Sequence, residues 1–430
     1  MKITVQYSIK ACLRKWWRYI TAISLSMFIL IFSYLLGNTS FPLPNEIELF
    51  QKINGWNAFL GVQKGNMPDS ILFINVCYDK ELVDYEENGI PVGKYVITDR
   101  EKLLRLLTQA KKANNYRYIF LDVIFEEGIK SPIDSALFHT IASMDRRVIP
   151  MHKDVTLDDS ILYPKAANAD YTIAWEETNF ARYQFLHKGI PSVPLRMYAD
   201  RLHLNDNGIK AYWGGLIYKD QGRWCRNGVT LMMNIRMTGR LMDTEGQVRE
   251  RNYIHLGADL LDLDSIIPVK DQIEDKIIVI GDFKNDIHDT YVGPQPGSVI
   301  CINAYLALLN GDHLINFWCV LALFLVYTTI GLWYLSGQSV TDFIKWRWLQ
   351  TVASFINKRV WLQVFFSFIS TSLFFAIVGI IAYHFNVAFN VWIPTIIYST
   401  LDAVMQRYND FFKKKNNEKI PVSPKPDTGS

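Results

Sequence analysis

Apolar segments near both ends of the chain, on either side of a polar centre, constrain the fold more than any other feature of this sequence. The first comprises residues 20–36 (ITAISLSMFILIFSYLL), has no charged residue and is about the minimum length for crossing a bilayer. Because basic flanks stay in the cytoplasm, residues 1–19 are predicted to be cytoplasmic and the following chain to leave the cytoplasm. The basic residues of this flank are Lys2, Lys10, Arg14, Lys15 and Arg18.

A cleaved signal peptide is the alternative interpretation of residues 20–36. The apolar run is longer than is usual in signal peptides, and no small-residue cleavage site follows it. We therefore predict a permanent transmembrane anchor.

Further apolar segments follow at residues 317–335, 361–383 and 391–405, and the last of them contains Pro394 and Asp402. The loop between the first two is basic, as are residues 406–430, whereas residues 384–390 contain neither lysine nor arginine. This charge bias predicts three transmembrane helices of alternating direction, with both chain ends in the cytoplasm and residues 40–315 outside it. The two ends of the chain thus place the centre on the same side independently.

The C-terminal segment, residues 406–430, is basic and then rich in proline. It is predicted to be too polar to fold alone, with its lysines lying against anionic lipid headgroups. We therefore expect no cytoplasmic catalytic domain on this chain. Asp402 either makes a polar contact inside a helix bundle or lies at the headgroups because the last span ends early, and we favour the second interpretation.

The composition fits a globular domain joined to a few transmembrane helices, because half of the residues are hydrophobic and 14% are aromatic. The net charge of +3 gives no indication of nucleic-acid binding. The 5 cysteines include no CxxC pair, which argues against a disulfide framework and against a zinc site. One disulfide among Cys77, Cys225 and Cys301 stays open beside the simpler interpretation of three buried thiols.

The central part of the chain begins with short apolar runs that alternate with amphipathic segments. Residues 71–76, 118–123 and 147–150 predict strands, and residues 99–113 and 134–144 predict the helices between them. This β-α-β-α-β order is typical of a parallel sheet with right-handed crossovers.

The pattern is weaker beyond residue 150. Residues 230–237 predict a strand, residues 253–262 a strand that turns into a helix, residues 277–280 a strand and residues 299–309 a helix. We therefore predict an extracytoplasmic α/β domain with a mainly parallel sheet. It is joined to an α-helical membrane region with one N-terminal and three C-terminal transmembrane helices.

Charged residues follow several predicted strands, at the sheet edge where ligands bind in open parallel sheets. If those strands are neighbours, the residues form an acidic site with one arginine, suited to a divalent cation or to a cationic or hydroxyl-rich ligand. The alternative is that each aspartate caps a turn or a helix and that the arginine pairs with one of them. The residues concerned are Asp79, Arg100, Asp122, Asp282, Asp286, His288 and Asp289.

Several separate segments also resemble one known family. They are FINVCYDKELVD, DREKLLRLL, YIFLDVIF, PIDSALFHTI, LMMNIRMTG, YIHLGADLL and EDKIIVIGDFKNDIHDTYVGPQPGSVICINAYLALLNG. Together they resemble the CHASE2 domain, the second class of cyclase/histidine-kinase-associated sensory extracellular domain of bacterial receptors. The last segment resembles that family's signature of a strand, Gly281, an acidic loop, Gly297 and a helix with Asn303. The topology, with one span before the domain and three after it, is also similar.

The resemblance turns the charged residues into candidates for ligand binding. The candidates are Asp79, Arg100, Asp122, Asp286, His288, Asp289 and Asn303. The chain departs from the family in the stretch GKYVITDR, where a Pro-Trp-Pro-like stretch is common. It also stops before the cyclase or kinase domain that family members usually carry, which implies a separate effector protein.

We expect a multi-pass protein of the bacterial inner (cytoplasmic) membrane whose periplasmic or extracellular domain senses a small ligand or a condition. Its expected partners are the lipid bilayer and a separate effector or a second copy of the chain, with no nucleic acid and no cofactor. An envelope structural or assembly component without a ligand is the alternative. An enzyme is not expected, because GxSxG and HExxH motifs are absent and no cysteine has a convincing catalytic partner.

Overall fold

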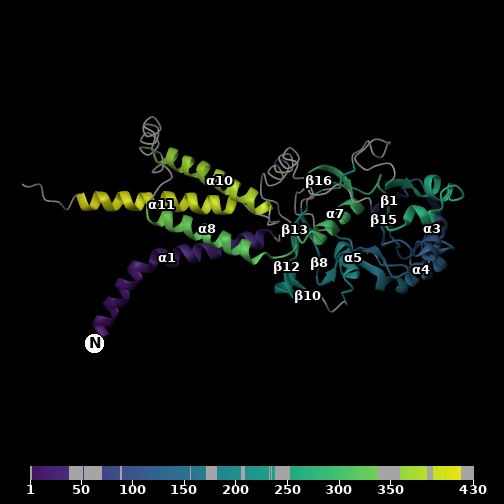
Figure 1. Cartoon of the computed structure of the whole chain (residues 1–430), viewed down its shortest axis with the longest axis horizontal. Helices are drawn as coiled ribbons and strands as arrows, with labels where there is room; N and C mark the ends of the chain where they lie inside the picture. The colour runs from purple at the N-terminus through teal and green to yellow at the C-terminus, as the bar shows by residue number, and fades with distance from the viewer. Residues whose placement is uncertain are drawn as a thin grey trace, which may run out of the picture. The chain divides into compact units, whose positions relative to one another are not determined.

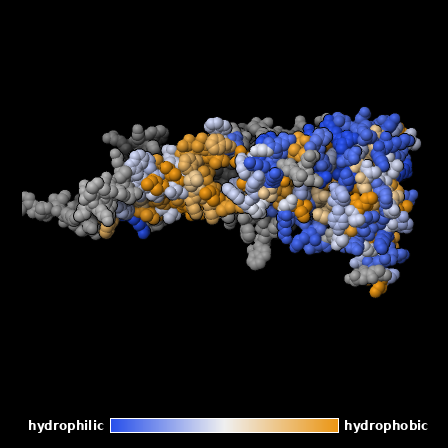
Figure 2. All heavy atoms as spheres, turned by 90° about the horizontal axis from the view of Figure 1, so that it is seen from below, coloured by the Kyte–Doolittle hydropathy of each residue, from blue (hydrophilic) through white to orange (hydrophobic). Residues whose placement is uncertain are grey.

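The computed structural model divides the chain into two compact units, which are described separately. Met1–Gly37 and Asn316–Ser430 form a helical unit, and Asn38–Ile315 form an α/β unit. The surface over the helices is mostly hydrophobic, whereas that of the α/β unit is mostly hydrophilic (Figure 2). The structure describes residues 2–37, 52, 70–87, 90–154, 156–170, 182–204, 209–231, 233, 235–237, 252–337, 359–384 and 391–417.

The helical unit contains four long helices in its described part: α1 (Lys2–Gly37), α8 (Phe317–Leu335), α10 (Val360–His384) and α11 (Trp392–Asn417) (Figure 1). Three segments, Trp16–Leu35, Phe317–Leu335 and Val364–Ile381, are long and apolar enough to cross a membrane. They coincide with the predicted spans at residues 20–36, 317–335 and 361–383.

The predicted fourth span, residues 391–405, falls in α11 and is not among those three segments. The helix α11 continues beyond this segment to Asn417, so residues 406–417 of the predicted tail are helical as an extension of α11. No glycine or proline occurs between Pro394 and Pro421, so nothing in the sequence ends the helix where its apolar part stops.

Small and polar side chains join the helices of this unit. A Cβ atom added at Gly331 of α8 would lie 3.4 Å from the Cβ atom of Ala22 of α1, which shows how closely the two helices approach. The hydroxyl of Tyr398 donates to the carbonyl of Tyr327 at 2.7 Å. Asp402 is buried within the unit and accepts a hydrogen bond from its helical neighbour Gln406 at 2.6 Å.

The centre of the α/β unit is a six-stranded sheet in the order β14-β1-β15-β4-β5-β6, and every pair in it is parallel. The predicted parallel sheet is therefore confirmed. In chain order its strands are β1 (Ile71–Asn75), β4 (Tyr118–Leu121), β5 (Arg147–Met151), β6 (Ala166–Asn168), β14 (Tyr253–His255) and β15 (Ile277–Gly281). The strand predicted last along the chain, β15, lies between the two predicted first, β1 and β4.

Helices cover both faces of this sheet, and alternate strand residues point to opposite faces. Leu72 and Ile74 of β1 pack on the side of α3 (Arg100–Ala113), α4 (Asp134–Ser143) and α6 (Val269–Ile273). Ile71 and Phe73 pack on the side of α5 (Val193–Arg201) and α7 (Gly297–Leu309). The α3 helix begins as predicted, because the side chain of Asp99 accepts a hydrogen bond from the backbone N–H of Lys102.

Smaller elements surround this core. The antiparallel pairs are β2 (Lys80–Glu87) with β3 (Ile90–Thr98), β7 (Arg182–Gln184) with β13 (Gly228–Thr230), β8 (Leu186–His187) with β9 (Ile190–Pro191), and β16 (Ile287–Thr290) with β17 (Gly293–Pro296). A three-stranded sheet contains β10 (Ile209–Tyr212), β11 (Ile217–Asp220) and β12 (Arg223–Arg226). Short helical turns are η1 (Ser160–Lys165), η3 (Trp213–Gly215) and the π-helical η6 (Leu256–Leu261).

The strand predicted at residues 230–237 was wrong. Strand β13 ends at Thr230, and the described residues 231, 233 and 235–237 belong to no strand. The predicted strand followed by a helix at residues 253–262 is confirmed, with η6 as a π-helix after β14.

Candidate functional site

The strands expected to form the site are neighbours, since β15 pairs with β1 on one side and with β4 on the other. Their carboxyl ends therefore meet at one edge of the sheet, so the condition on which the predicted site depended is met. The charged side chains at this edge nevertheless separate into several groups, because they leave the strands on different faces.

The Asp79 side chain makes contacts inside the α/β unit. It is buried, and its carboxylate accepts hydrogen bonds from the Lys102 ammonium at 2.7 Å and from the backbone N–H of Gly257 at 3.1 Å. A Cβ atom at Gly257 would lie 2.5 Å from Asp79 Oδ1, so the residue at position 257 must lack a side chain for η6 to approach this carboxylate. Asp79 thus joins α3 to η6, and these contacts occupy its carboxylate.

Arg100 lies on the α3 side of the sheet and is only 1% exposed. Its guanidinium group lies 4.4 Å from the centre of the Phe125 ring, and its Nε atom is 3.8 Å from Asp134 Oδ1. Burial lowers the pKa of Arg100, against the opposing effect of Asp134 and other acidic neighbours. The Nε and Nη1 atoms have no hydrogen-bond partner among the described residues. Arg100 is therefore buried beside Phe125 and Asp134, apart from the other candidate residues.

The loop after β15 begins with a turn that Asp282 shapes. Asp282 Oδ1 accepts hydrogen bonds from the backbone N–H groups of Lys284 and Asn285, at 3.2 and 3.0 Å, and its Oδ2 atom pairs with the Lys80 ammonium at 2.8 Å. Burial raises the pKa of this carboxyl group, but hydrogen bonds from Lys80 and Asn285 outweigh burial, so the net direction is downward. The turn-capping alternative therefore describes Asp282 correctly.

A second group of side chains gathers at the first turn of α7, on the other face of the sheet. Asp122 follows β4, its backbone N–H donates to Ile280 at 2.7 Å, and its side chain bonds Ser298 of α7. The Asp286 carboxylate lies beside the helix start and accepts a contact of 2.9 Å from His288 Nε2. We call Asp122, Asp286, His288 and Ser298 the α7 cluster.

Two glycines permit this close packing. A Cβ atom at Gly297 would lie 2.5 Å from Asp286 Oδ2, and a Cβ atom at Gly281 would lie 3.3 Å from the hydroxyl of Ser298. Both glycines belong to the segment that resembled a family signature, and both are explained by the approach of polar side chains to the backbone.

The surroundings of Asp122 in the α7 cluster change its pKa. Burial, followed by the nearby charge of Asp286, raises the pKa of Asp122 from 3.8 to about 8, although the hydrogen bond from Ser298 opposes the rise. Asp122 consequently carries a proton at neutral pH. Asp286 and His288 are more accessible, with side chains 44% and 30% exposed, so solvent and solutes reach the cluster from their side.

The other predicted site residues lie outside this cluster. Asp289 is exposed on strand β16, where it follows His288 and therefore points to the opposite face. Asn303 is buried in α7, and its amide both accepts from the N–H of Ile235 at 2.9 Å and donates to the carbonyl of Ile235 at 2.8 Å. Asn303 therefore holds an irregular segment in place rather than facing a ligand site.

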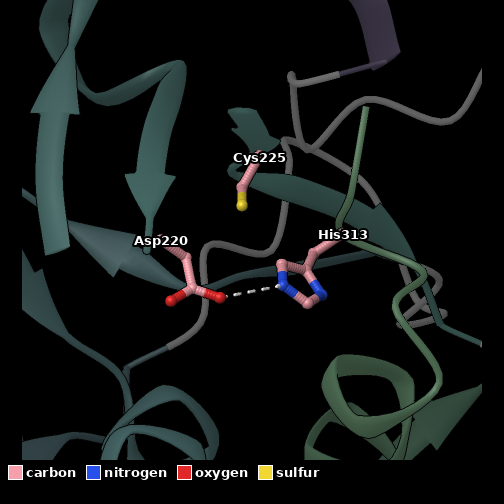
Figure 3. A group of neighbouring side chains, drawn as sticks. All are labelled: Asp220, Cys225 and His313. Atoms are coloured by element: carbon pink, nitrogen blue, oxygen red, sulfur yellow. Dashed lines mark ion pairs between the residues drawn. The ribbon is translucent and has the colours of Figure 1, made fainter. Parts of the chain in front are cut away.

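A third group of side chains was not anticipated from the sequence. Asp220, Cys225 and His313 are all buried, and the potential ligand atoms that they offer lie within 4.8 Å of one another. Figure 3 shows these side chains converging, with the ion pair between Asp220 Oδ2 and His313 Nε2 at 3.9 Å. Burial raises the pKa of Cys225 to about 12 and lowers the pKa of His313. No spacing motif links these positions, and the hairpin that carries two of them was not predicted.

Among the described side chains, four cysteines are free thiols: Cys77, Cys225, Cys301 and Cys319. Cys77, Cys225 and Cys301 are buried and unpaired with one another, in agreement with the interpretation of three buried thiols.

Comparison with known families addresses the resemblance seen in the sequence. A family model, the CHASE2 domain, matches residues 63–337. The chain belongs to the CHASE2 family. The match covers most of the chain and includes the whole six-stranded sheet, the α7 cluster and the first helix after the α/β unit. CHASE2 is an extracellular sensory domain, so the expectation of a sensory domain is confirmed. No curated protein and no solved structure matches the chain.

Proposed function

We propose that this CHASE2 protein is a multi-pass membrane sensor of the bacterial inner membrane. Its α/β unit lies outside the cytoplasm, detects a solute or a condition there, and relays the change to a separate effector protein or to a second copy of the chain. We further propose that the role is one of binding, without catalysis. The match to a sensory domain family over residues 63–337 is the observation that carries this proposal.

The position of the α7 cluster supports a sensing role. Ser298 and Gly297 form the first turn of α7, and this helix ends at Leu309. Residues 310–316 then lead to α8, which is long and apolar enough to cross a membrane. Any change at the first turn of α7 therefore acts on the helix that precedes a span, with a short connection between them.

The chemistry of the cluster indicates what kind of stimulus suits it. The Asp286 side chain is accessible, while Asp122, whose pKa is raised to about 8, holds an exchangeable proton close to it. A cation, a hydrogen-bond donor such as a hydroxyl-rich solute, or a rise in pH would each change the balance of charge at this point. A buried carboxyl group with a raised pKa beside an accessible carboxyl group is thus suited to distinguish two states.

The first test concerns topology. Whole spheroplasts are treated with a protease, and fragments are detected with one antibody against the α/β unit and one against the basic segment after Met405. We expect the α/β unit to be digested and the basic segment to be protected, since the charge bias places them on opposite sides. Digestion of the basic segment with an intact α/β unit refutes the proposal.

The second test concerns the relay. Affinity capture of the intact protein from its native membrane, followed by mass spectrometry, should recover an effector protein with the wild-type chain. A variant with Asp286→Asn changes the accessible carboxylate, and Asp289→Asn is the matched control on the same hairpin. We expect the first variant alone to change the effector's output or its recovery. Equal behaviour of both variants and the wild type argues against sensing by this cluster.

A structural or assembly role without a ligand is the second candidate, and one observation favours it. Asp79 and Asn303 use their polar groups on internal contacts with Lys102, Gly257 and Ile235. This role predicts that substitutions in the α7 cluster change only the stability of the protein. A solute that raises the apparent Tm of the wild type but not of Asp286→Asn contradicts it.

A further inference from the structure

The β11–β12 hairpin brings two of the three unanticipated side chains to one face. Its turn consists of Gln221 and Gly222, both with positive φ, which is typical of tight hairpins. Tyr218 pairs with Cys225 and Asp220 pairs with Arg223 across the hairpin. Because residues two apart in a strand and residues paired across strands share a face, Asp220 and Cys225 point to the same side.

His313 reaches that side from the connection between α7 and α8. The backbone turns at Gly311, whose φ is +79°, and then runs beside β12. The carbonyl of His313 accepts from the N–H of Arg226 at 2.9 Å, and the N–H of Ile315 donates to the carbonyl of Trp224 at 3.0 Å. The imidazole is therefore held over the hairpin by backbone bonds on both sides of it.

The polar atoms of this group are buried and incompletely bonded. The side chains of Asp220 and His313 are 1% and 0% exposed, and Cys225 is equally buried. Among the described residues, the two ring nitrogens of His313 have no hydrogen-bond partner, and the Oδ1 atom of Asp220 has none either. Leaving such groups unsatisfied in the interior is costly, and Figure 3 shows the side chains that carry them close together, with Asp220 Oδ2 facing His313 Nε2.

The surroundings orient the three side chains. The Oδ2 atom of Asp220 accepts hydrogen bonds from the Tyr198 hydroxyl and the Arg223 guanidinium group, each at 3.1 Å, and these bonds fix the oxygen that faces His313. The His313 ring stacks on Tyr218 with an interplanar angle of 5° and meets the edge of Tyr198. Outer contacts of this kind fix the orientation of metal ligands in proteins.

We propose that Asp220, Cys225 and His313 form a binding site for Zn²⁺. A carboxylate, a thiolate and an imidazole are the ligand types that zinc prefers, and three protein ligands leave the fourth tetrahedral position for a solvent molecule. Tetrahedral coordination requires ligand atoms roughly 3.4–3.6 Å apart, so the present separations of up to 4.8 Å have to shorten by about 1 Å. Binding replaces the proton on the Cys225 thiol, and that proton passes to the solvent buffer.

Zinc bound here fastens the connection after α7 to the β11–β12 hairpin. His313 belongs to the connection, whereas Asp220 and Cys225 belong to the hairpin. The site rests on geometry within the α/β unit, so it stands or falls independently of any sensing role.

Metal binding is measured on the full chain in detergent, purified with a tag that contains no histidine and stripped with a chelator. Zn²⁺ is titrated in competition with a chromophoric chelator, and Co²⁺ is added to a parallel sample because thiolate ligation to Co²⁺ gives a near-ultraviolet charge-transfer band. We expect about one Zn²⁺ per chain and this band in the wild type. Affinity should fall at least about tenfold in C225S and in H313Q. The matched control is C301S, which alters another buried thiol and should retain both signals.

The proposal is overturned if the wild type binds no Zn²⁺, in which case the three residues form a buried polar network only. It is equally overturned if C225S keeps the affinity and the charge-transfer band. Should C225S or H313Q fail to fold, the wild type and the controls C77S and C301S decide. All three must then show the band, and loss of the band in either control assigns the metal to that cysteine instead.

Discussion

The Asp122 carboxyl group is expected to make the folded α/β unit less stable as the pH rises through the neutral range. Its pKa is about 8 in the folded protein, raised from 3.8 first by burial and then by the charge of Asp286. Between these two pH values the folded state holds one proton more than the unfolded state at this group. Stability therefore declines with rising pH across that window, and the contribution of the neutral carboxyl group is lost above about pH 8.

The size of the effect follows from the proton difference. One extra bound proton in the folded state changes the free energy of unfolding by at most about 1.4 kcal/mol for each pH unit. For a domain of this size, 1 kcal/mol corresponds to roughly 2–4 °C in Tm, so the expected decline is about 3–6 °C per pH unit. Partial solvent access to the cluster reduces the expected decline in Tm. A decline of half this size is still measurable.

The assay is thermal unfolding of the full chain in detergent, followed at pH values from about 5 to about 9. Asp122→Asn replaces the carboxyl group with a neutral group of the same shape that can still bond Ser298. Comparison of the variant with the wild type cancels the contributions of all other titrating groups. We expect the difference between the two Tm values to be smallest near pH 5 and to grow in favour of the variant up to about pH 8, above which it stays constant.

Two further variants test the cause. Asp286→Asn removes a neighbouring negative charge, so the pH at which the wild-type decline ends should move downward. Asp289→Asn changes an exposed carboxylate of the same hairpin and should leave the profile unaltered. A wild-type profile that parallels that of Asp122→Asn over the whole range refutes the assignment of a raised pKa to Asp122.

Two other predictions concern contacts that hold the α/β unit together. Asn303→Ala leaves the buried N–H and carbonyl groups of Ile235 without the Asn303 amide and should lower stability by about 1–3 kcal/mol. The loss should be seen as a lower Tm and as faster proteolysis near residue 235. An unchanged Tm contradicts the role assigned to Asn303. Gly257→Ala places a Cβ atom 2.5 Å from Asp79 Oδ1 and should lower stability by about 1–3 kcal/mol. The control is Gly93→Ala, where nothing lies within 4 Å of the added Cβ atom and the Tm should be nearly unchanged. Equal effects of the two substitutions would refute the close approach at Gly257.

The sheet was predictable because its strands are continuous apolar runs with no competing pattern. The runs that became β1, β4 and β15 are buried on both faces, as a central parallel strand requires. Their adjacency, and hence the meeting of Asp122 with the loop after β15, was only a condition in the sequence analysis, because the order of the strands was not predicted. The helix predicted at residues 99–113 was equally readable from its local apolar face.

The assignment of individual side chains was less predictable, because it depends on which face each side chain leaves. Asp122 directly follows β4 and Arg100 is the first residue of α3. The Asp122 side chain nevertheless points toward α7, and the Arg100 side chain points toward Phe125. Strand parity beyond the last paired residue decides the direction of Asp122, whereas Arg100 takes its direction from the first turn of α3. Composition carries no information about either. A single acidic site with one arginine was therefore the wrong grouping.

Long-range partners account for the remaining differences. Residues 231–237 alternate as a strand would, but their backbone bonds the side chains of Tyr291, Asn303 and Gln295, which come from distant parts of the chain. The meeting of His313 with Cys225 depends likewise on pairing between the connection after α7 and a hairpin. Local periodicity contains no record of such pairings.

The place of β15 in the sheet has a consequence for the order in which the protein assembles. It is the last strand of the sheet along the chain, and yet it is the only described strand that pairs with both β1 and β4. Until Ile277–Gly281 has been synthesised, two half-sheets with unpaired, apolar edges have no partner to join them. The nascent domain must therefore be shielded from aggregation until late in its translation, and chains truncated before this strand should be unable to reach the native fold.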